Sequence, residues 1–208
     1  VLFTPRTERG KNPWVVVQDV LFQHNTLKNI AQGFNIMGKD NHAPNDTPSN
    51  NIVIHNNLFE NVGAFETRAY WLKLIRTIFY LTISNNTVRF AGSDLNHGIA
   101  LSINNPKSGE VAQVTHATFV DNVIEHQQYG FNGDRLEKGA NLFETNFPGL
   151  NMSGNFFLKK PGDTRNLARR YAADSGFMDN TFVEAGETPD PGDAGVDMER
   201  LLQKQQKP

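Results

Sequence analysis

Asparagine recurs through this chain in one frame, and that frame constrains the fold more than any other feature. Six windows align on a shared asparagine: Asn25, Asn57, Asn86, Asn122, Asn155 and Asn180. The steps between them are 32, 29, 36, 33 and 25 residues, in a chain where 24 of 208 residues are asparagine. Repeats with a period of a few tens of residues are typical of solenoids, propellers and arrays.

The residues around each asparagine repeat as well. Three positions earlier the windows hold only apolar residues: Phe22, Ile54, Ile83, Phe119, Met152 and Phe177. Two positions later they again hold only apolar residues: Leu27, Phe59, Val88, Ile124, Phe157 and Phe182. Directly before it come mostly residues that tolerate a left-handed backbone: His24, Asn56, Asn85, Asp121, Gly154 and Asp179. Each window therefore predicts a short strand, a tight bend and a second short strand.

An all-β fold follows from stacking these windows. Strands of neighbouring coils lie about 4.8 Å apart, so the aligned asparagines can hydrogen-bond to one another and to the backbone of each bend. We predict a right-handed parallel β-helix of about six coils with an asparagine ladder. A leucine-rich repeat would need a leucine frame that is absent, and an α/β fold would need amphipathic helices where this chain has polar, Gly/Pro/Asn-rich connections.

A third strand per coil precedes the later windows. We place these strands at 33–38, 70–75, 97–103 and 129–133. Alternation predicts that one set of side chains points inward: Phe34, Ile36, Leu72, Leu74, Ile99, Leu101 and Phe131. The other set is predicted to point outward: Asn35, Trp71, Lys73, Ala100, Ser102 and Asn132.

The coils are expected to fill residues 1–184, and 185–208 to form a C-terminal tail or cap. Because the chain begins with Val in the middle of a repeat-like stretch, we expect it to be the C-terminal part of a longer solenoid. Residues 159–176 form a longer basic connection with room for one helical turn. Asp193 or Asp197 is placed to cap a short amphipathic helix that carries Met198, Leu201 and Leu202.

The composition of the chain limits which classes of binding partner and site are expected. Twenty Lys and Arg against 22 Asp and Glu give a net charge of −2, so nothing favours nucleic acid. The apolar stretches are too short to span a membrane, and the absence of cysteine excludes disulfides and thiolate metal sites. We expect a monomer.

The quoted repeats resemble a known superfamily. "NPWVVVQDVLFQHNTLKNIAQGFNIMG", "NNIVIHNNLFENVG" and "LTISNNTVRFAG" are similar to coils of the pectin-lyase-like superfamily, and in particular to exported bacterial β-helix proteins, over residues 12–184. The resemblance implies a secreted, periplasmic or cell-surface protein. Its members include polysaccharide lyases, hydrolases, esterases, phage tailspikes and non-catalytic surface proteins, so fold alone does not select an activity.

Catalytic patterns are sparse. A hydrolase would need two carboxylates that flank the scissile bond, and this chain has no Asp-Asp pair. A lyase would need a base beside a uronate and acids for a cation. As candidates we take Lys73 and Arg68 for the catalytic base, and Asp40 and Asp46 for a Ca²⁺ ion, with no other cofactor expected.

The candidate substrate-binding residues lie on the outward strand face and the loop after it: Asn35, Tyr70, Trp71, Ser102, Asn132 and Asp134. Amides, hydroxyls and aromatic rings suit sugars, which present hydroxyls around an apolar ring face. We expect the protein to bind a polysaccharide, with acidic polymers included. β-Elimination at uronates is one alternative, and a non-catalytic surface or adhesin-like module is the other.

Overall fold

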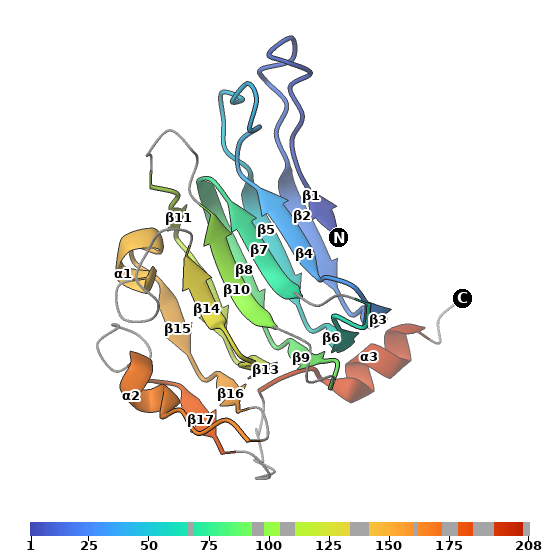
Figure 1. Cartoon of the computed structure of the whole chain (residues 1–208). Helices are drawn as coiled ribbons and strands as arrows, with labels where there is room; N and C mark the ends of the chain where they lie inside the picture. The colour runs from blue at the N-terminus through green and yellow to red at the C-terminus, as the bar shows by residue number, and fades with distance from the viewer. Residues whose placement is uncertain are drawn as a thin grey trace.

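The computed structural model describes residues 1–65, 69–92, 98–104, 111–133, 142–159, 162–171, 179–184 and 194–205. Three sheets, each with parallel strands only, wrap around one apolar core as a parallel β-helix (Figure 1). The predicted fold class is confirmed.

Each sheet contains one strand from each successive turn. Sheet A has the order β1 (Leu2–Phe3), β4 (Phe34–Met37), β7 (Tyr70–Ile75), β10 (Ile99–Asn104) and β14 (Gly130–Gly133). Sheet B has the order β2 (Gln18–Gln23), β5 (Asn50–His55), β8 (Ile78–Ser84), β12 (Thr118–Val120) and β15 (Asn151–Ser153), with β11 (Val114–Thr115) also paired to β8. Sheet C has the order β3 (Thr26–Ile30), β6 (Leu58–Val62), β9 (Thr87–Phe90), β13 (Val123–Glu125), β16 (Phe156–Leu158) and β17 (Thr181–Val183).

Counted from a sheet B strand through sheets C and A, four turns are complete in the described part of the chain, from β2 to β14, fewer than the six coils expected. After β14 the chain adds strands to sheets B and C only, and helices α1 (Leu142–Asn146) and α2 (Leu167–Tyr171) occupy the connections. The ring of Tyr171, which is fully buried, lies edge-on to Phe131 at 5.7 Å. The helical turn predicted within residues 159–176 is confirmed as α2.

The asparagine ladder runs the length of the stack. Each member donates its side-chain amide to Oδ1 of the next member, from Asn25 to Asn180, at 2.7–3.0 Å. Each backbone N–H donates to the same oxygen at 2.9–3.0 Å. The four inner members are fully buried: Asn57, Asn86, Asn122 and Asn155.

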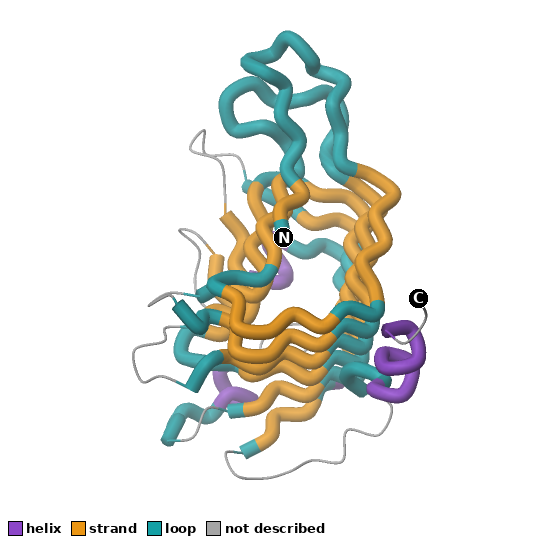
Figure 2. The backbone as a smooth tube through the Cα atoms, turned by 90° about the vertical axis from the view of Figure 1, so that its right-hand side faces the viewer, coloured by secondary structure: helices purple, strands orange, loops and turns teal. Residues whose placement is uncertain are grey.

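The residue before each of the first five ladder asparagines adopts the predicted left-handed conformation. The φ angles are 56° at His24, 51° at Asn56, 54° at Asn85, 54° at Asp121 and 65° at Gly154. In Figure 2 successive turns follow the same path, so the corners between the sheets stack over one another.

Inward packing follows the prediction in β4 and in the second half of β7 and β10, and departs from it in the first half of β7 and β10. Leu72 of β7 pairs with Leu101 of β10, and both are buried in the core as predicted. Trp71 and Ala100, predicted outward, are fully buried in the core instead, and Ile99, predicted inward, pairs with Tyr70 on the outer face. A register shift at β10 places two consecutive residues inward, which simple alternation excludes.

The C-terminal residues fold back onto the outside of the stack. Helix α3 (Met198–Gln205) begins after Asp197, whose Oδ1 accepts the N–H of Arg200 at 3.0 Å, so the predicted Asp197 cap is confirmed. Asp193 lies outside the described residues. Leu201 is buried, whereas Met198 and Leu202 are exposed. In Figure 2, α3 lies beside the stacked corners.

Candidate functional site

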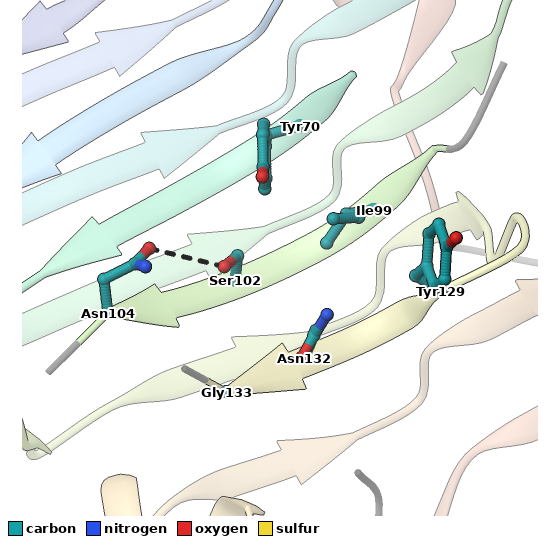
Figure 3. A pocket seen from close by; sticks show the side chains of 7 residues that line it. All are labelled: Tyr70, Ile99, Ser102, Asn104, Tyr129, Asn132 and Gly133. Carbon is teal, nitrogen blue, oxygen red and sulfur yellow. Dashed lines mark hydrogen bonds between the residues drawn. The ribbon is translucent and has the colours of Figure 1, made fainter. Parts of the chain in front are cut away.

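A polar hollow of about 330 Å³ lies on the outer face of sheet A, across the last three strands of that sheet. It is lined by Tyr70, Ile99, Ser102, Asn104, Tyr129, Asn132 and Gly133. Figure 3 shows Ile99 between the two tyrosines, Ser102 and Asn104 further along the same strand, and Asn132 on the neighbouring strand. We call this hollow the tyrosine pocket.

Strand register produces the pocket. Lys73 of β7 pairs with Ser102 of β10, and Ser102 pairs with Asn132 of β14, so these three residues form one outward row. Asn35 of β4 extends the row, because it pairs with Lys73. The structure thus brings together three of the predicted binding residues, Tyr70, Ser102 and Asn132, in one pocket and places Asn35 further along the same row.

The pocket offers donors and acceptors without formal charge. Ser102 Oγ lies 3.5 Å from Oδ1 of Asn104, a long contact that leaves the hydroxyl and both amides able to bond a ligand. Among the described residues that line it, none is an acid, a lysine, an arginine or a histidine. Such a surface can hold a neutral polyhydroxyl ring by hydrogen bonds while the tyrosine rings cover its apolar face.

The sequence did not identify Tyr129 as a site residue. Hydrogen bonds from a later segment of the chain fix the bend that carries Tyr129. Gln127 and Gly130 on either side of it have φ angles of 57° and 56°. Arg165 donates to the carbonyl oxygens of Gln127, at 3.1 Å, and of Gln128. Asp163 in turn accepts from Arg165 at 2.5–2.7 Å, and this hydrogen bond is the main reason that the pKa of Asp163 falls to about 2.

A buried hydrogen-bond network continues beneath the bend. The hydroxyl of Tyr171 lies 2.7 Å from Nε2 of His126, and it also accepts the N–H of Phe131 at 3.4 Å. His126 Nδ1 lies 2.8 Å from the carbonyl oxygen of Gln127. A Cβ added at Gly130 would lie 2.0 Å from His126, so this position accepts glycine alone. The bend is therefore fixed before any ligand arrives.

Lys73 stands next to the pocket, and it is not among the residues that line it. Its Nζ lies 5.3 Å from the centre of the Tyr70 ring, a cation–π contact that supports the ring from outside the pocket. The other predicted catalytic residue, Arg68, lies outside the described residues, as does the predicted binding residue Asp134.

Trp71 does not supply the aromatic surface expected of it. Its ring is fully buried, 5.9 Å from the ring of Phe59 and 6.1 Å from that of Phe119. The backbone of Trp71 packs against Gly33, where an added Cβ would lie 2.2 Å from the carbonyl oxygen of Trp71. Tyr70, one residue earlier, faces the pocket in its place.

The predicted cation ligands anchor a loop. Asp40 is buried, and its carboxylate accepts the N–H of Thr7 and the N–H of His42, both at 2.9 Å. Burial would raise the pKa of Asp40, but these two backbone bonds and nearby Arg6 outweigh it, so the pKa lies below its ordinary value. Asp46 donates its N–H to the carbonyl oxygen of Pro13 at 2.9 Å. Within the described ranges, no three His, Asp or Glu side chains cluster in a way that would hold a metal ion.

A second hollow, of about 390 Å³, lies where the C-terminal segment crosses the stacked corners. Its lining includes His55, Asn56, Asn85, Asp197 and Arg200. Burial, and then the charges of His24 and Arg200, lower the pKa of His55. Because Asn56 Oδ1 accepts the N–H of Asp197 at 2.6 Å, this hollow belongs to the seat of α3.

Comparison with family models, with curated proteins and with solved structures finds no match to this chain. None of the helices in the described ranges is long and apolar enough to cross a membrane.

Proposed function

We propose that the protein binds a polysaccharide along the outer face of sheet A, with one sugar residue seated in the tyrosine pocket. The observation that carries the proposal is the composition of the pocket: two tyrosines, two amides and one serine hydroxyl converge on one hollow from three neighbouring turns. Hydroxyls and amides that converge on one hollow suit a ligand that is itself rich in hydroxyls.

An extended ligand suits this face. The row from Asn35 through Lys73 and Ser102 to Asn132 presents one polar side chain per turn, and turns repeat about every 4.8 Å. A linear polymer can contact several turns at once, and weak contacts made together by one chain add up in affinity. On this proposal the protein works outside the cytoplasm, where such polymers occur.

Affinity electrophoresis tests the proposal. Wild-type protein is run through gels that contain homogalacturonan, alginate, xylan, glucomannan or a soluble cellulose derivative. We expect retardation in at least one gel, and a weaker effect for Asn132→Ala. Gln23→Ala, which removes an exposed amide from sheet B, is the matched control and should migrate as wild type. Normal migration of the wild-type protein in every gel contradicts the proposal.

Cleavage by β-elimination is a second candidate, and the position of Lys73 favours it. Lys73 lies one turn from Ser102 in the outward row, and β-elimination needs a basic side chain beside the uronate to remove the proton next to its carboxylate. Incubation with the uronate polymers, with and without Ca²⁺, should then raise the ultraviolet absorbance of unsaturated products. If the absorbance does not rise with any polymer, cleavage by β-elimination is ruled out. The proposal is then that the protein binds the polysaccharide without cleaving it.

A further inference from the structure

A second column of left-handed residues runs along sheet B, within strands β2, β5 and β8 and in the turns before β12 and β15, five positions before the residue that precedes each of the first five ladder asparagines. Its members are Asp19, Asn51, Tyr80, His116 and Gly149, with φ angles of 55°, 51°, 53°, 55° and 72°. The flanking residues of the first three members are in register, because Gln18 pairs with Asn50 and Asn50 pairs with Phe79. We call this set the outer column.

Neighbouring members of the outer column contact one another in pairs. Asn51 donates its side-chain amide to Oδ1 of Asp19 at 2.6 Å. The rings of Tyr80 and His116 are stacked, with centroids 4.6 Å apart and an interplanar angle of 7°. Both rings are exposed to solvent, and Tyr80 retains 55% of its accessible surface.

Tyr80 is a poor choice for stability at its position. A tyrosine is strained in the left-handed region, which Asn, Asp, His and Gly tolerate far better, and its exposed ring recovers little of that cost through packing. Gly149 is not required by its backbone, because four other members adopt the same conformation with side chains. It is not required by space either, because a Cβ there would meet nothing within 4 Å. Departures of this kind from local preference are expected at functional sites.

Tyr80 covers one face of the His116 ring. Thr118 pairs with Asn151, so Gly149 takes the position next to His116 in the column, and the space beside it is open. We call this open space the slot. We propose that a pyranose ring of a polysaccharide occupies this slot, stacked on His116 above Gly149. The slot is open to solvent, which suits a ligand with one flat C–H face and hydroxyls around its rim.

This site is distinct from the tyrosine pocket, because it lies on sheet B and shares no residue with it. Both sites are proposed to bind sugars, so a binding signal from the whole protein would not tell them apart. Each site is therefore followed by the resonances of its own residues. The tyrosine pocket is followed by the resonances of Tyr70 and Tyr129, and the slot by those of His116. Either site can fail while the other holds.

The experiment is a titration followed by NMR. Hexasaccharides of galacturonate, xylose, glucose and mannose are added separately to the isotopically labelled full chain, and the ring protons of His116 are monitored. Phenol is titrated in parallel as an aryl ring that lacks hydroxyls around its rim. Two variants accompany the wild type: His116→Asn, which removes the stacking ring, and Gly149→Asn, which fills the slot. Both place a residue that tolerates the left-handed backbone, so both are expected to fold.

We expect at least one hexasaccharide to shift the His116 ring protons saturably. Gly149→Asn should weaken that interaction roughly fivefold or more, which corresponds to about 1 kcal/mol. His116→Asn should weaken binding of the same sugar at this site by a similar factor, read from the neighbouring Tyr80 resonances, without lowering the melting temperature. The proposal is overturned if no hexasaccharide moves the His116 resonances, if phenol alone moves them, or if the shift persists unchanged in Gly149→Asn.

Discussion

Asn57 donates its backbone N–H and its side-chain amide to the same atom, Oδ1 of Asn86, at 3.0 Å in each case. The same amide also reaches the carbonyl oxygens of Phe22 and His55, at 3.0 Å each. One side chain therefore ties together the backbone of two turns and the ladder partner of a third. The fold depends on this arrangement because every bend would otherwise bury unpaired backbone groups.

Substitution of a ladder member should cost stability in proportion to its burial. Asn57→Ala takes hydrogen-bond partners away from several buried and half-buried groups, among them the backbone N–H of Asn25 and the carbonyl oxygens of Phe22 and His55. We expect a loss of about 3 kcal/mol or more in the free energy of unfolding, since each unpaired buried group costs about 1–3 kcal/mol. Asn25→Ala, at the half-buried end of the ladder, should cost about 1 kcal/mol or less. Urea denaturation measures both, and an unchanged midpoint for Asn57→Ala would contradict the ladder.

Removal of the buried leucine of α3 should release the helix. Leu201 is 1% exposed, so Leu201→Ala should destabilise the protein by about 2–4 kcal/mol. The neighbouring Leu202 is 50% exposed, and Leu202→Ala is the matched control, with an expected effect below about 0.5 kcal/mol. Thermal unfolding and limited proteolysis compare the two. Equal effects of the two substitutions would show that α3 does not dock through Leu201.

The Asp163–Arg165 pair makes an acid-dependent contribution to stability. The pKa of Asp163 is lowered to about 2 in the folded protein, chiefly by its hydrogen bond from Arg165, against about 3.9 for an unfolded aspartate. A lowered carboxyl pKa stabilises the fold above the unfolded value, and that stability is lost as the pH falls from about 4 to about 2. Asp163→Asn should flatten the stability–pH curve in this window. An unaltered slope for the variant would contradict the pairing.

The pKa of Glu125 is shifted in the opposite direction from that of Asp163. Burial raises its pKa even though it accepts the N–H of Phe90 at 2.6 Å and the amide of Gln127 at 3.0 Å. A raised carboxyl pKa means that the fold favours the protonated form, so stability declines as the pH rises through the unfolded and then the folded pKa. Glu125→Gln keeps an acceptor and removes the half-buried charge. We expect it to raise stability at neutral pH by about 0.5–1 kcal/mol, and a fall in melting temperature would contradict this.

The fold was predictable because the ladder residues are uniform. In every turn an asparagine side chain hydrogen-bonds the backbone groups of the bend. Asparagine therefore recurs from Asn25 to Asn180, and its spacing reveals the period. The outer column has the same spacing but was missed, because an exposed left-handed position accepts residues as different as Asp19, Tyr80 and Gly149. A fixed offset of five residues from the first column was the only signal for it.

The site was predictable in part for a related reason. Ser102 and Asn132 alternate regularly with core residues, so period-two reasoning placed them outward in one row. That reasoning failed at Trp71 and Ile99, because a shift in register cannot be read from side-chain type. Tyr129 was missed because its position depends on a bend held by Arg165, 36 residues later in the chain.

The most direct test of the central claim is calorimetric titration with a fragment of whichever polysaccharide retards the protein. Tyr129→Ala removes one ring of the tyrosine pocket, and Gln23→Ala serves as the control on sheet B. We predict saturable heat for the wild type and the control, and at least a fivefold weaker affinity for Tyr129→Ala, equivalent to about 1 kcal/mol. Equal affinities for wild type and Tyr129→Ala would contradict the assignment of this pocket as the binding site.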